Sequence, residues 1–496
     1  MADGQKMQMD EGVTRPLSDL LPSSVSIPNH AKTIDVSGIT ADSREVKPGF
    51  IFAALKGVNL DGTRFVDQAI DAGAVAILVD ETVTLDASVP VLAVENPRRE
   101  LAQIAARLYP AQPEVIAAVT GTAGKTSVAA FLRQIWKHAG KQAASVGTVG
   151  VVSDVENIYG SLTTPDPVAL HKTIDRLANA GVTHLAIEAS SHGIDQYRLD
   201  GVNISTGGFT NLGRDHMDYH ATVEEYFDAK MGLVERLLPE GADFVVEPES
   251  PFGAKAEERA DASHLNVLSV GEKARAIELT QLEREGFAQK MTLKFGDETY
   301  DVLLPLVGRF QVSNALVAAG MAYSTGVAPK VIVEALQGLK GESGRLEYVG
   351  ETSNGALVFI DYAHKVEALE NVLEALRPYA DNNLVCVFGC GGDRDHGKRA
   401  LMGAISAKFA DKTIVTDDNP RSEDPALVRA AIIEAVPDAS EIGDREQAIF
   451  SAIADAESGD VIVIAGKGHE TGQIIKDKTL PFSDHEVVAR ALNAQT

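Results

Sequence analysis

The stretch that decides the fold is Val115-Ile116-Ala117-Ala118-Val119-Thr120-Gly121-Thr122-Ala123-Gly124-Lys125-Thr126. Its apolar start predicts a buried strand, and the helical pattern of Ser127 to His138 follows the glycine-rich turn. Glycines let successive backbone N–H groups point at a phosphate, and the helix N-terminus adds partial positive charge. Lys125 is expected to reach the outer phosphates, and Thr126 to bind Mg²⁺. The stretch therefore predicts a strand–loop–helix unit that binds ATP or a similar nucleotide.

This loop is a shortened form of the GxxxxGK[ST] phosphate loop. Counting back from Gly124, the first position falls on Val119, and the leading glycine is Gly121. The alternative is an ordinary glycine-rich turn without a ligand. Because Lys-Thr follows the glycine directly, phosphate binding is the favoured interpretation. The expected loop contacts to ATP are Gly121, Thr122, Ala123, Gly124, Lys125, Thr126 and Ser127.

Segments on both sides of this unit predict an α/β protein of three domains. Pro110-Ala111-Gln112-Pro113 ends the helical pattern of Pro97 to Tyr109, since each proline restricts itself and its predecessor. After Leu339, predicted strands and helices alternate as far as Val461 to Ala465, which is typical of a parallel sheet with helices on both faces. We expect an N-terminal domain over 1–110, a central P-loop ATPase domain with a parallel-rich sheet over 111–338, and a C-terminal Rossmann-like doubly wound sheet over 339–496. Roughly the first 15–20 residues are expected to be disordered.

Composition excludes some classes of function. The 496 residues carry a formal net charge of −26, whereas sequence-independent nucleic-acid binding needs a dense positive surface. No uninterrupted apolar run reaches membrane length, and the polar segment Met1 to Val13 has no signal core. Cys386 and Cys390 show neither zinc spacing nor a disulfide framework. We expect a cytoplasmic protein with reduced cysteines, no nucleic-acid partner and no membrane span.

Carboxylate and imidazole side chains follow predicted strands of the central segment. Glu188 ends a strand and precedes Ser190-Ser191-His192-Gly193, and Asp215-His216-Met217-Asp218-Tyr219-His220 comes later. Such groups near a phosphate loop suit Mg²⁺, which prefers oxygen ligands and usually shares substrate phosphates. For each histidine, the residues alone favour the alternative of a hydrogen-bonded loop side chain.

Together these segments resemble the Mur ligase family, in the right order from Asp42-Ser43-Arg44 to the C-terminus. The resemblance also rests on Gly308-Arg309-Phe310 to Asn314, Gly344-Arg345-Leu346-Glu347 and Asp361-Tyr362-Ala363-His364. The stretches FGCGGDRDHGKR (388–399), DNPRSEDP (418–425) and GKGHE (466–470) are similar to the diaminopimelate-adding members.

The resemblance implies an ATP-dependent ligase of peptidoglycan precursor synthesis. ATP would phosphorylate the D-glutamate γ-carboxylate of UDP-N-acetylmuramoyl-L-alanyl-D-glutamate, and an amino group of meso-diaminopimelate would attack the acyl phosphate. The alternatives are the same ligation with L-lysine, a different amide ligase such as a folylpolyglutamate synthetase, and a P-loop ATPase that acts as a switch or as a transporter partner. We expect a monomer.

The resemblance also implies roles for matching residues. It implies catalytic roles for Lys125, Lys230 and His216, and Mg²⁺ contacts from Thr126, Glu188, His216 and Lys230. Lys230 would react with CO₂ to become N6-carboxylysine; the alternative is an ordinary surface lysine. Further ATP contacts are implied for Asn314, Arg345, Asp361 and His364. The UDP precursor is expected at Ser43, Arg44, Asn59, Thr163, Thr164, Ser190, Gln196 and Arg198, and diaminopimelate at Arg394, Asp418, Asn419, Pro420, Arg421, Gly466 and Glu470.

Diaminopimelate differs from lysine by one distal carboxylate. The planar fork of Arg421 suits a carboxylate, and Arg394 adds a second cation, whereas Glu470 accepts from the distal ammonium. Lysine would leave the arginine unpaired, which would discriminate against it about a thousandfold or more. The alternative for Arg421 is a loop salt bridge with Glu423 or Asp424.

Three places depart from the family's pattern. Ala123 replaces a usual asparagine, so its hydrogen bonds must come from other groups. Gln311 replaces Asn or His, and Lys365-Val366 replaces the Thr-Pro that usually follows His364. We expect ATP binding to survive the first change, and the last to alter the position of His364 or domain closure.

Overall fold

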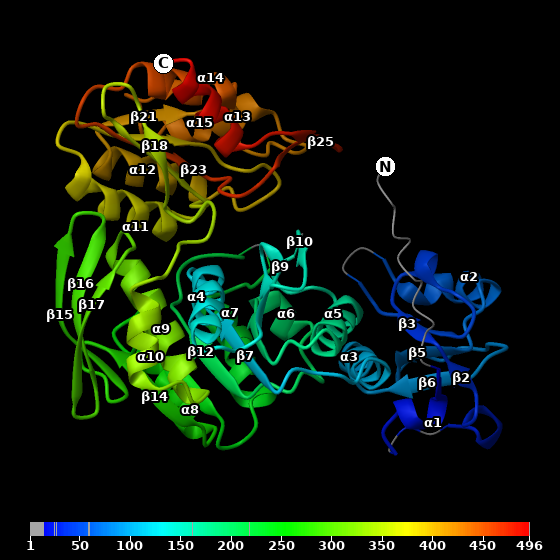
Figure 1. Cartoon of the computed structure of the whole chain (residues 1–496). Helices are drawn as coiled ribbons and strands as arrows, with labels where there is room; N and C mark the ends of the chain where they lie inside the picture. Colours follow the sequence, from blue (N-terminus) through cyan, green and yellow to red (C-terminus); the bar gives the residue numbers. More distant parts are fainter. Residues whose placement is uncertain are drawn as a thin grey trace, which may run out of the picture.

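Figure 1 follows the chain through three α/β domains, and the computed structural model describes residues 14–495 except 24, 26, 58–59, 161 and 218. Among the described helices, none is both long enough and apolar enough to cross a membrane. The predicted fold class, with a parallel-rich central sheet and a doubly wound C-terminal sheet, is confirmed.

The N-terminal domain contains a parallel sheet in the order β3-β4-β5-β6. Its strands are β3 (Gly38–Thr40), β4 (Phe50–Ala53), β5 (Ala76–Asp80) and β6 (Val91–Val94), and its helices are α1 (Leu17–Leu20), η1 (Asn29–Ala31), η2 (Ser43–Glu45), η3 (Gly62–Phe65), α2 (Val66–Asp71) and α3 (Pro97–Leu108). The Asn96 side chain accepts from Arg99 N, and Pro97 follows as the first helical residue, so α3 begins where a cap and a proline coincide.

The N-terminal end of the described chain corrects one expectation. Strand β1 (Arg15–Pro16) pairs antiparallel with β2 (Asp35–Val36), and Leu17 and Leu20 are fully buried in the N-terminal core. The expected disorder is therefore wrong for residues 15–20, because burying these leucines stabilises the segment. Met1–Val13 lies outside the described residues.

The central domain contains a sheet in the order β10-β9-β8-β11-β7-β12-β13-β14-β15-β16-β17. The strands are β7 (Val115–Thr120), β8 (Ala143–Gly147), β9 (Gly150–Val152), β10 (Asn157–Ile158), β11 (His184–Glu188), β12 (Thr206–Phe209), β13 (Asp243–Val246), β14 (Asn266–Gly271), β15 (Ile277–Glu285), β16 (Ala288–Phe295) and β17 (Glu298–Leu304). Pairing is parallel from β8 to β15 and antiparallel at both edges, including the hairpin of β16 and β17.

Helices cover both faces of this sheet. They are α4 (Lys125–His138), α5 (Pro167–Asn179), α6 (Ser191–Asp195), α7 (Val223–Gly232), η4 (Leu233–Leu237), α8 (Gly253–Ala262), α9 (Arg309–Ser324) and α10 (Pro329–Leu336). Ala117 and Val119 pack with α4, α9 and α10, whereas Ile116 and Ala118 pack with α5 to α8. Alternate residues of β7 thus supply two separate cores, which explains its uninterrupted apolar sequence.

The C-terminal domain has a sheet in the order β18-β19-β23-β20-β21-β22, in which only β18 is antiparallel among the described strands. The strands are β18 (Glu347–Glu351), β19 (Leu357–Asp361), β20 (Leu384–Phe388), β21 (Lys412–Val415), β22 (Ser440–Glu441) and β23 (Val461–Ala465), with a separate hairpin of β24 (Gly472–Ile475) and β25 (Lys478–Pro481). Helices α11 (Val366–Leu376), α12 (Lys398–Phe409) and α13 (Pro425–Ile433) cover one face, and α14 (Arg445–Ala454) and α15 (Asp484–Asn493) cover the other; η5 (Arg377–Tyr379) follows α11.

The C-terminal domain contacts the central domain at several places, two of which lie at the ends of sheet strands. In Figure 1 it lies beside the ends of β15 and β16, where Phe287 stacks on Tyr379 with ring centroids 5.2 Å apart. The second place is the carboxyl edge of both parallel sheets, where Arg345 donates to Thr126. Ligands of open α/β sheets bind at such edges, and this edge contains the candidate site.

Candidate active site

The phosphate loop connects β7 to α4 in the predicted way. Gly121 and Gly124 both adopt positive φ, at 143° and 88°. A Cβ atom at Gly121 would collide with the Thr210 hydroxyl, and one at Gly124 would collide with the Asn314 amide oxygen. The two glycines therefore permit both the turn and the close approach of neighbouring elements.

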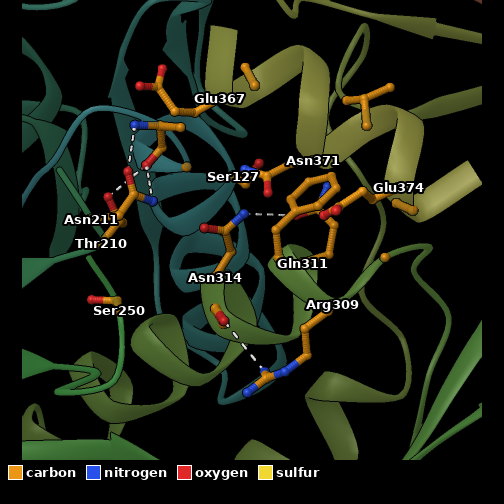
Figure 2. A pocket seen from close by; sticks show the side chains of 18 of the residues that line it. Ser127, Thr210, Asn211, Ser250, Arg309, Gln311, Asn314, Glu367, Asn371 and Glu374 are labelled. Atoms are coloured by element: carbon orange, nitrogen blue, oxygen red, sulfur yellow. Dashed lines mark hydrogen bonds between the residues drawn. The ribbon is translucent and has the colours of Figure 1, made fainter. Parts of the chain in front are cut away.

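Hydrogen bonds from the end of β12 hold the loop at Ala123. Ala123 N donates to Asn211 Oδ1 at 3.1 Å, and Ala123 O accepts from Thr210 Oγ1 at 2.6 Å. These bonds involve the backbone of Ala123, so the loop is held although this position lacks a polar side chain. Gln311 is buried beside the loop, where its Oε1 accepts from Asn314 Nδ2 at 3.0 Å (Figure 2).

Three cavities share lining residues along this edge. The nucleotide cavity, of about 660 Å³, extends from the loop to α9 and α11. The phosphate chamber, of about 210 Å³, lies around Lys125, Glu188 and Lys230. The substrate cavity, of about 420 Å³, lies between β11 and the C-terminal loops that contain Asn419 and Arg421. Together they connect the nucleotide end of the site to its substrate end.

The nucleotide cavity contains several of the predicted ATP contacts. Figure 2 shows Ser127 and Asn314 near Gln311, with Asn371 and Glu374 of α11 opposite. Arg345 and Asp361 line both this cavity and the phosphate chamber. The lining from the predicted set is Thr122, Ala123, Gly124, Thr126, Ser127, Asn314, Arg345 and Asp361.

Two lysines of the central domain converge on the loop carbonyls in the phosphate chamber. Lys125 Nζ donates to Gly121 O at 2.8 Å and Thr122 O at 3.1 Å, and Lys230 Nζ donates to Gly121 O at 2.8 Å. Burial, with Lys365 nearby, lowers the pKa of Lys125 to about 8. Burial and the neighbouring ammonium groups of Lys125 and Lys365 hold the pKa of Lys230 well below its usual range. Lys230 is 1% exposed, which contradicts the alternative of a surface lysine.

The residues expected to bind Mg²⁺ differ in how well they fit it. Glu188 Oε2 accepts from Thr126 Oγ1 at 3.1 Å, so a carboxylate and a hydroxyl lie together at the helix start. In the described part of the chain, no group of three His, Cys, Asp or Glu side chains forms a metal site by itself. Mg²⁺ usually needs few protein ligands, because it completes its shell with phosphates and water. Lys230 fits only without its ammonium charge, because an ammonium group has no lone pair for a metal.

His216 has an unusual backbone and a crowded ring. Its φ is 55°, a left-handed value that is uncommon outside glycine. Its ring centroid lies 4.6 Å from that of His192, and its Nε2 lies 3.1 Å from Asp215 Oδ2. Burial, with a further effect of Lys365, lowers the pKa of His216 to about 3. A neutral imidazole at pH 7 retains the lone pair that a metal ligand needs.

The start of the C-terminal domain adds polar side chains to the phosphate chamber, among them Arg345, Asp361 and His364. Arg345 Nη2 donates to Thr126 Oγ1 at 3.1 Å. Asp361 accepts from the backbone N–H of Leu346 and of Ala363, and burial raises its pKa to about 6. His364 lines the phosphate chamber and the substrate cavity, with Nδ1 2.8 Å from Tyr362 O.

The central wall of the substrate cavity contains Thr163, Thr164, Ser190 and Arg198. Arg198 donates to Thr164 O at 2.7 Å and to Gln196 Oε1 at 2.8 Å. Gln196 lies outside the cavity lining and orients the guanidinium. This wall can present a cation and hydroxyls to a carboxylate ligand.

A hydrogen-bond network fixes Asn419 in the opposite wall. Its Oδ1 accepts from Lys467 Nζ and from Ile474 N, both at 2.9 Å, and its Nδ2 donates to Glu470 Oε2 at 3.0 Å. Lys467 is fully buried and also donates to Gly472 O at 2.8 Å. Lys467 was not among the residues predicted from the sequence, although it lies within the GKGHE motif that could have indicated it.

Hydrogen bonds of its backbone to β24 and to Lys476 fix the position of Arg421. Its φ is 51°, its N–H donates to Ile474 O at 3.0 Å, and its carbonyl accepts from Lys476 N at 2.6 Å. Its Nη1 donates to Gly392 O at 2.9 Å. The alternative salt bridge is not formed: Glu423 binds Arg399, and Asp424 caps α13.

The remaining residues of the predicted diaminopimelate set lie around Arg421. Arg394 and Arg421 both line the substrate cavity, so two cations lie in one part of it. Burial and the charge of Arg394 lower the pKa of Arg421. Gly466 adopts a φ of 117° and approaches Asp418 closely. The members that line the cavity are Arg394, Asp418, Asn419, Arg421, Gly466 and Glu470, whereas the Pro420 carbonyl lies against Gly392.

Ser43 and Arg44, which are expected to contact the UDP precursor, lie apart from the three cavities. Ser43 Oγ lies 3.4 Å from Gln68 Oε1, and Arg44 forms an ion pair with Asp42. Neither Ser43 nor Arg44 lines the nucleotide cavity, the phosphate chamber or the substrate cavity. Asn59 lies outside the described residues.

Comparisons with known proteins agree with this architecture. Three family models match in order: the Mur ligase family catalytic domain over residues 35–109, the Mur ligase middle domain over 119–322, and the Mur ligase glutamate ligase domain over 344–468. A relative from Brucella melitensis, named UDP-N-acetylmuramoyl-L-alanyl-D-glutamate–2,6-diaminopimelate ligase, is 55% identical over 469 residues, which are 94% of this chain and 96% of the relative. A relative of the same name from Zymomonas mobilis is 46% identical and covers 95% of this chain and 98% of its own length.

Solved structures agree as well. A structure with that same ligase name superposes with a TM-score of 0.70 at 30% identity and covers 97% of this chain and 99% of its own. A MurF ligase from Thermotoga maritima in complex with ADP shares the fold, with a TM-score of 0.61 at 18% identity, over 92% of this chain and 97% of its own. The family models, the full-length relatives and the joined cavities lead to one assignment: the chain belongs to the Mur ligase family.

Proposed function

We propose that the chain is an ATP-dependent ligase that adds meso-diaminopimelate to UDP-N-acetylmuramoyl-L-alanyl-D-glutamate. The observation that carries the proposal is the continuity of the three cavities. A phosphate chamber joins a nucleotide cavity to a substrate cavity whose C-terminal wall contains Arg421, Asn419 and Glu470. ATP, an acceptor carboxylate and an amino acid can therefore meet at one point.

The chemistry needs an activated carboxylate, because a carboxylate is a poor electrophile. Its oxygen attacks the γ-phosphorus, and the electron pair of the broken P–O bond remains on ADP. The amine then adds to the acyl carbon, loses a proton, and expels inorganic phosphate. Lys125 neutralises phosphate charge, and Arg198 holds a carboxylate of the precursor. Mg²⁺, held by Thr126, Glu188 and His216, would supply further positive charge when it is bound.

We propose that Lys230 carries a carbamate in the active enzyme. Its lowered pKa favours the neutral amine, which can attack the carbon of CO₂ and release a proton. The product has a negative charge where an ammonium would repel Mg²⁺. Its position beside Gly121 and Lys125 supports this role, since an anion there would offset two ammonium groups.

The choice of diaminopimelate rests on charge complementarity. Arg421 and Arg394 line the same cavity, and a distal carboxylate would pair with both. Lysine would leave these cations without a partner, which is costly in a partly buried site. Glu470 and the oriented amide of Asn419 remain for the distal ammonium and the rest of the amino acid.

The proposal extends to the precursor and to the setting of the reaction. Ser43, Arg44 and Asn59 would bind the uridine end, and the muramoyl dipeptide would extend from there to Thr163, Thr164 and Ser190. A single chain provides both walls of the substrate cavity, which supports action as a monomer. ATP and a UDP-linked substrate place the reaction in the cytoplasm.

Phosphate release tests the proposal directly. Purified UDP-N-acetylmuramoyl-L-alanyl-D-glutamate and Mg·ATP are supplied with either meso-diaminopimelate or L-lysine. We expect release that depends on diaminopimelate, with tripeptide product confirmed by mass. The absence of amino-acid-dependent release with either substrate would refute the ligase. A preference for lysine would refute the specificity assigned to Arg421 and leave the amide chemistry intact.

A further inference from the structure

Lys365 lies where the three cavities meet. Among the described residues, it alone lines the nucleotide cavity, the phosphate chamber and the substrate cavity. Any phosphoryl group that passes from ATP to an acceptor in the substrate cavity must cross this junction. The chain thus places a cation at the crossing point.

The contacts of Lys365 connect the two domains. It precedes α11 of the C-terminal domain, yet its Nζ donates to Thr122 O of the phosphate loop at 3.2 Å. The same Nζ lies 2.6 Å from Asp215 Oδ2 in an ion pair, and the Lys365 side chain is 15% exposed. Beside it, Glu367 Oε1 accepts from Arg214 N at 2.9 Å. These contacts hold the ammonium in a defined place against the loop.

The hydrogen-bonding capacity of this ammonium is not exhausted. A lysine ammonium has three N–H donors, and the described contacts of Lys365 Nζ are the Thr122 carbonyl and Asp215. The carbonyl is a neutral acceptor, whereas a phosphoryl oxygen is charged and adds ion-pair attraction to the hydrogen bond. An anionic phosphoryl group at the junction would therefore attract the remaining donor.

We propose that Lys365 is a catalytic residue that binds the γ-phosphoryl group of ATP and follows it to the acceptor carboxylate; this rests on the proposed ligase function. Because Lys365 belongs to the C-terminal domain, docking of that domain brings the Lys365 charge to the site that contains Lys125. During transfer, the bond from the γ-phosphorus to the β,γ-bridging oxygen breaks with its electron pair on ADP, while a carboxylate oxygen forms the new bond. Lys365 donates a hydrogen bond to a non-bridging oxygen throughout and transfers no proton.

The test compares two nucleotides that differ at the γ position. Binding of ADP and of the non-hydrolysable analogue AMPPNP is measured by calorimetry with Mg²⁺ for the wild type, Lys365→Met, Lys365→Thr and Lys365→Arg. We expect Met and Thr to weaken AMPPNP binding about tenfold and to leave ADP binding within about twofold, because only the analogue has a γ-phosphoryl group. We expect kcat to fall about 100-fold with KM for diaminopimelate nearly unchanged, and Arg to retain most activity.

Lys408→Met is the matched control. Lys408 lies on α12 and pairs with Glu370 at 3.4 Å, and neither residue lines any of the three cavities. Loss of Lys408 should therefore change the binding of neither nucleotide. Equal weakening of ADP and AMPPNP by the Lys365 variants would refute the proposal, because it would mean that Lys365 only supports domain packing. Unchanged binding and kcat would refute it as well. Lys365→Thr guards against misfolding of the Met variant, since it removes the same charge with a small polar side chain. Normal nucleotide selectivity without diaminopimelate-dependent turnover would refute the ligase function alone.

Discussion

The carboxyl edges of the central and C-terminal sheets each surround a buried lysine, but the two lysines have different partners. Lys230 Nζ donates to the neutral carbonyl of Gly121 and has two other ammonium groups nearby. Lys467 Nζ donates to Asn419 Oδ1 and to Glu470 Oε2, with the carboxylate 3.3 Å away. Both side chains are at most 1% exposed, so the contrast is one of charge and not of burial.

This contrast separates two kinds of binding edge. At the central edge, Lys125 and Lys230 donate to backbone carbonyls that leave their charge uncancelled, whereas Lys365 pairs with the carboxylate of Asp215. Phosphate, carbamate or carboxylate must therefore complete the site around Lys125 and Lys230. At the C-terminal edge, Lys467 is already paired with Glu470 and orients Asn419. Loss of Lys230 should therefore act mainly through charge, and loss of Lys467 mainly through the position of Asn419.

Removing Lys230 gives the largest expected effect. Lys230→Ala should lower kcat at least about 1,000-fold, because the charge stabilisation that depends on this position contributes several kcal/mol. Short carboxylic acids such as acetate should partly restore turnover by replacing the carbamate. Phosphate release with and without acetate measures both. Lys330→Ala, at an exposed position on α10, should leave kcat unchanged. Full activity of the Lys230 variant would end the carbamate proposal.

Replacing Arg421 tests charge at the C-terminal edge, where Lys467 pairs with Glu470 but Arg421 forms no ion pair within the described part of the chain. Arg421→Asn keeps a residue that tolerates the φ of 51°. We expect kcat/KM for diaminopimelate to fall about 100-fold, while that for lysine rises, because lysine no longer leaves an unpaired guanidinium. Paired assays with both amino acids measure the ratio. An unchanged ratio would show that specificity lies elsewhere in the cavity.

Loss of Lys467 should affect the orientation of Asn419 and Glu470 more than the phosphate chemistry. In Lys467→Met, the Asn419 amide loses a donor to Oδ1, and Glu470 loses its neighbouring cation. We expect KM for diaminopimelate to rise about tenfold, a cost of one buried charged hydrogen bond, with ADP affinity unchanged. Titration calorimetry with ADP and steady-state kinetics separate the two effects. Lys478→Met, on the exposed strand β25, is the control. A matching loss of ADP binding would contradict the division between the edges.

Strands and helices with a clear pattern of apolar residues could be predicted from the sequence. The strand and helix around Gly121 and Lys125 were predicted, and β23 follows its predicted bounds. Strand β12 (Thr206–Phe209) was missed, because Gly207 and Gly208 give it little apolar pattern. A Cβ at Gly208 would approach Met321 Sδ at 2.6 Å, so close packing against α9 accounts for this glycine.

Site residues that lie within a sequence motif could be predicted. Site residues whose role depends on a partner far away in the sequence could not. Arg421 and Asn419 could be predicted from DNPR, since this loop follows a strand end. The contact of Lys365 with Thr122 spans 243 positions in the sequence, and nothing near either residue signals it. The Lys467 hydrogen bond to Asn419 similarly depends on β23 and β21, which the folded sheet places on either side of β20.

The smallest expected effect concerns the segment that connects the two edges. Next to Arg345, Gly344 N donates to Glu347 Oε2 at 2.6 Å, and His485 Nε2 lies 2.8 Å from the same oxygen. The hydrogen bond to Glu347 raises the pKa of His485. Burial opposes ionisation of Glu347, but the bonds from His485 and Gly344 outweigh it and lower the Glu347 pKa.

The sign of the pH dependence follows from these two directions. The His485 contribution is fully present below its unfolded pKa of about 6.5 and is lost as pH rises through the folded value. The Glu347 contribution is present above an unfolded pKa of about 4.3 and is lost as pH falls. His485→Gln should therefore lower the free energy of unfolding most between about pH 5 and 6.5, by less than about 1 kcal/mol because both groups are partly exposed, and least near pH 8. Urea unfolding of both proteins at pH 5.5 and pH 8 measures the difference. A larger effect at pH 8 would show that the histidine acts there as a neutral packing group, and the connecting segment would then depend on shape, as the C-terminal edge does.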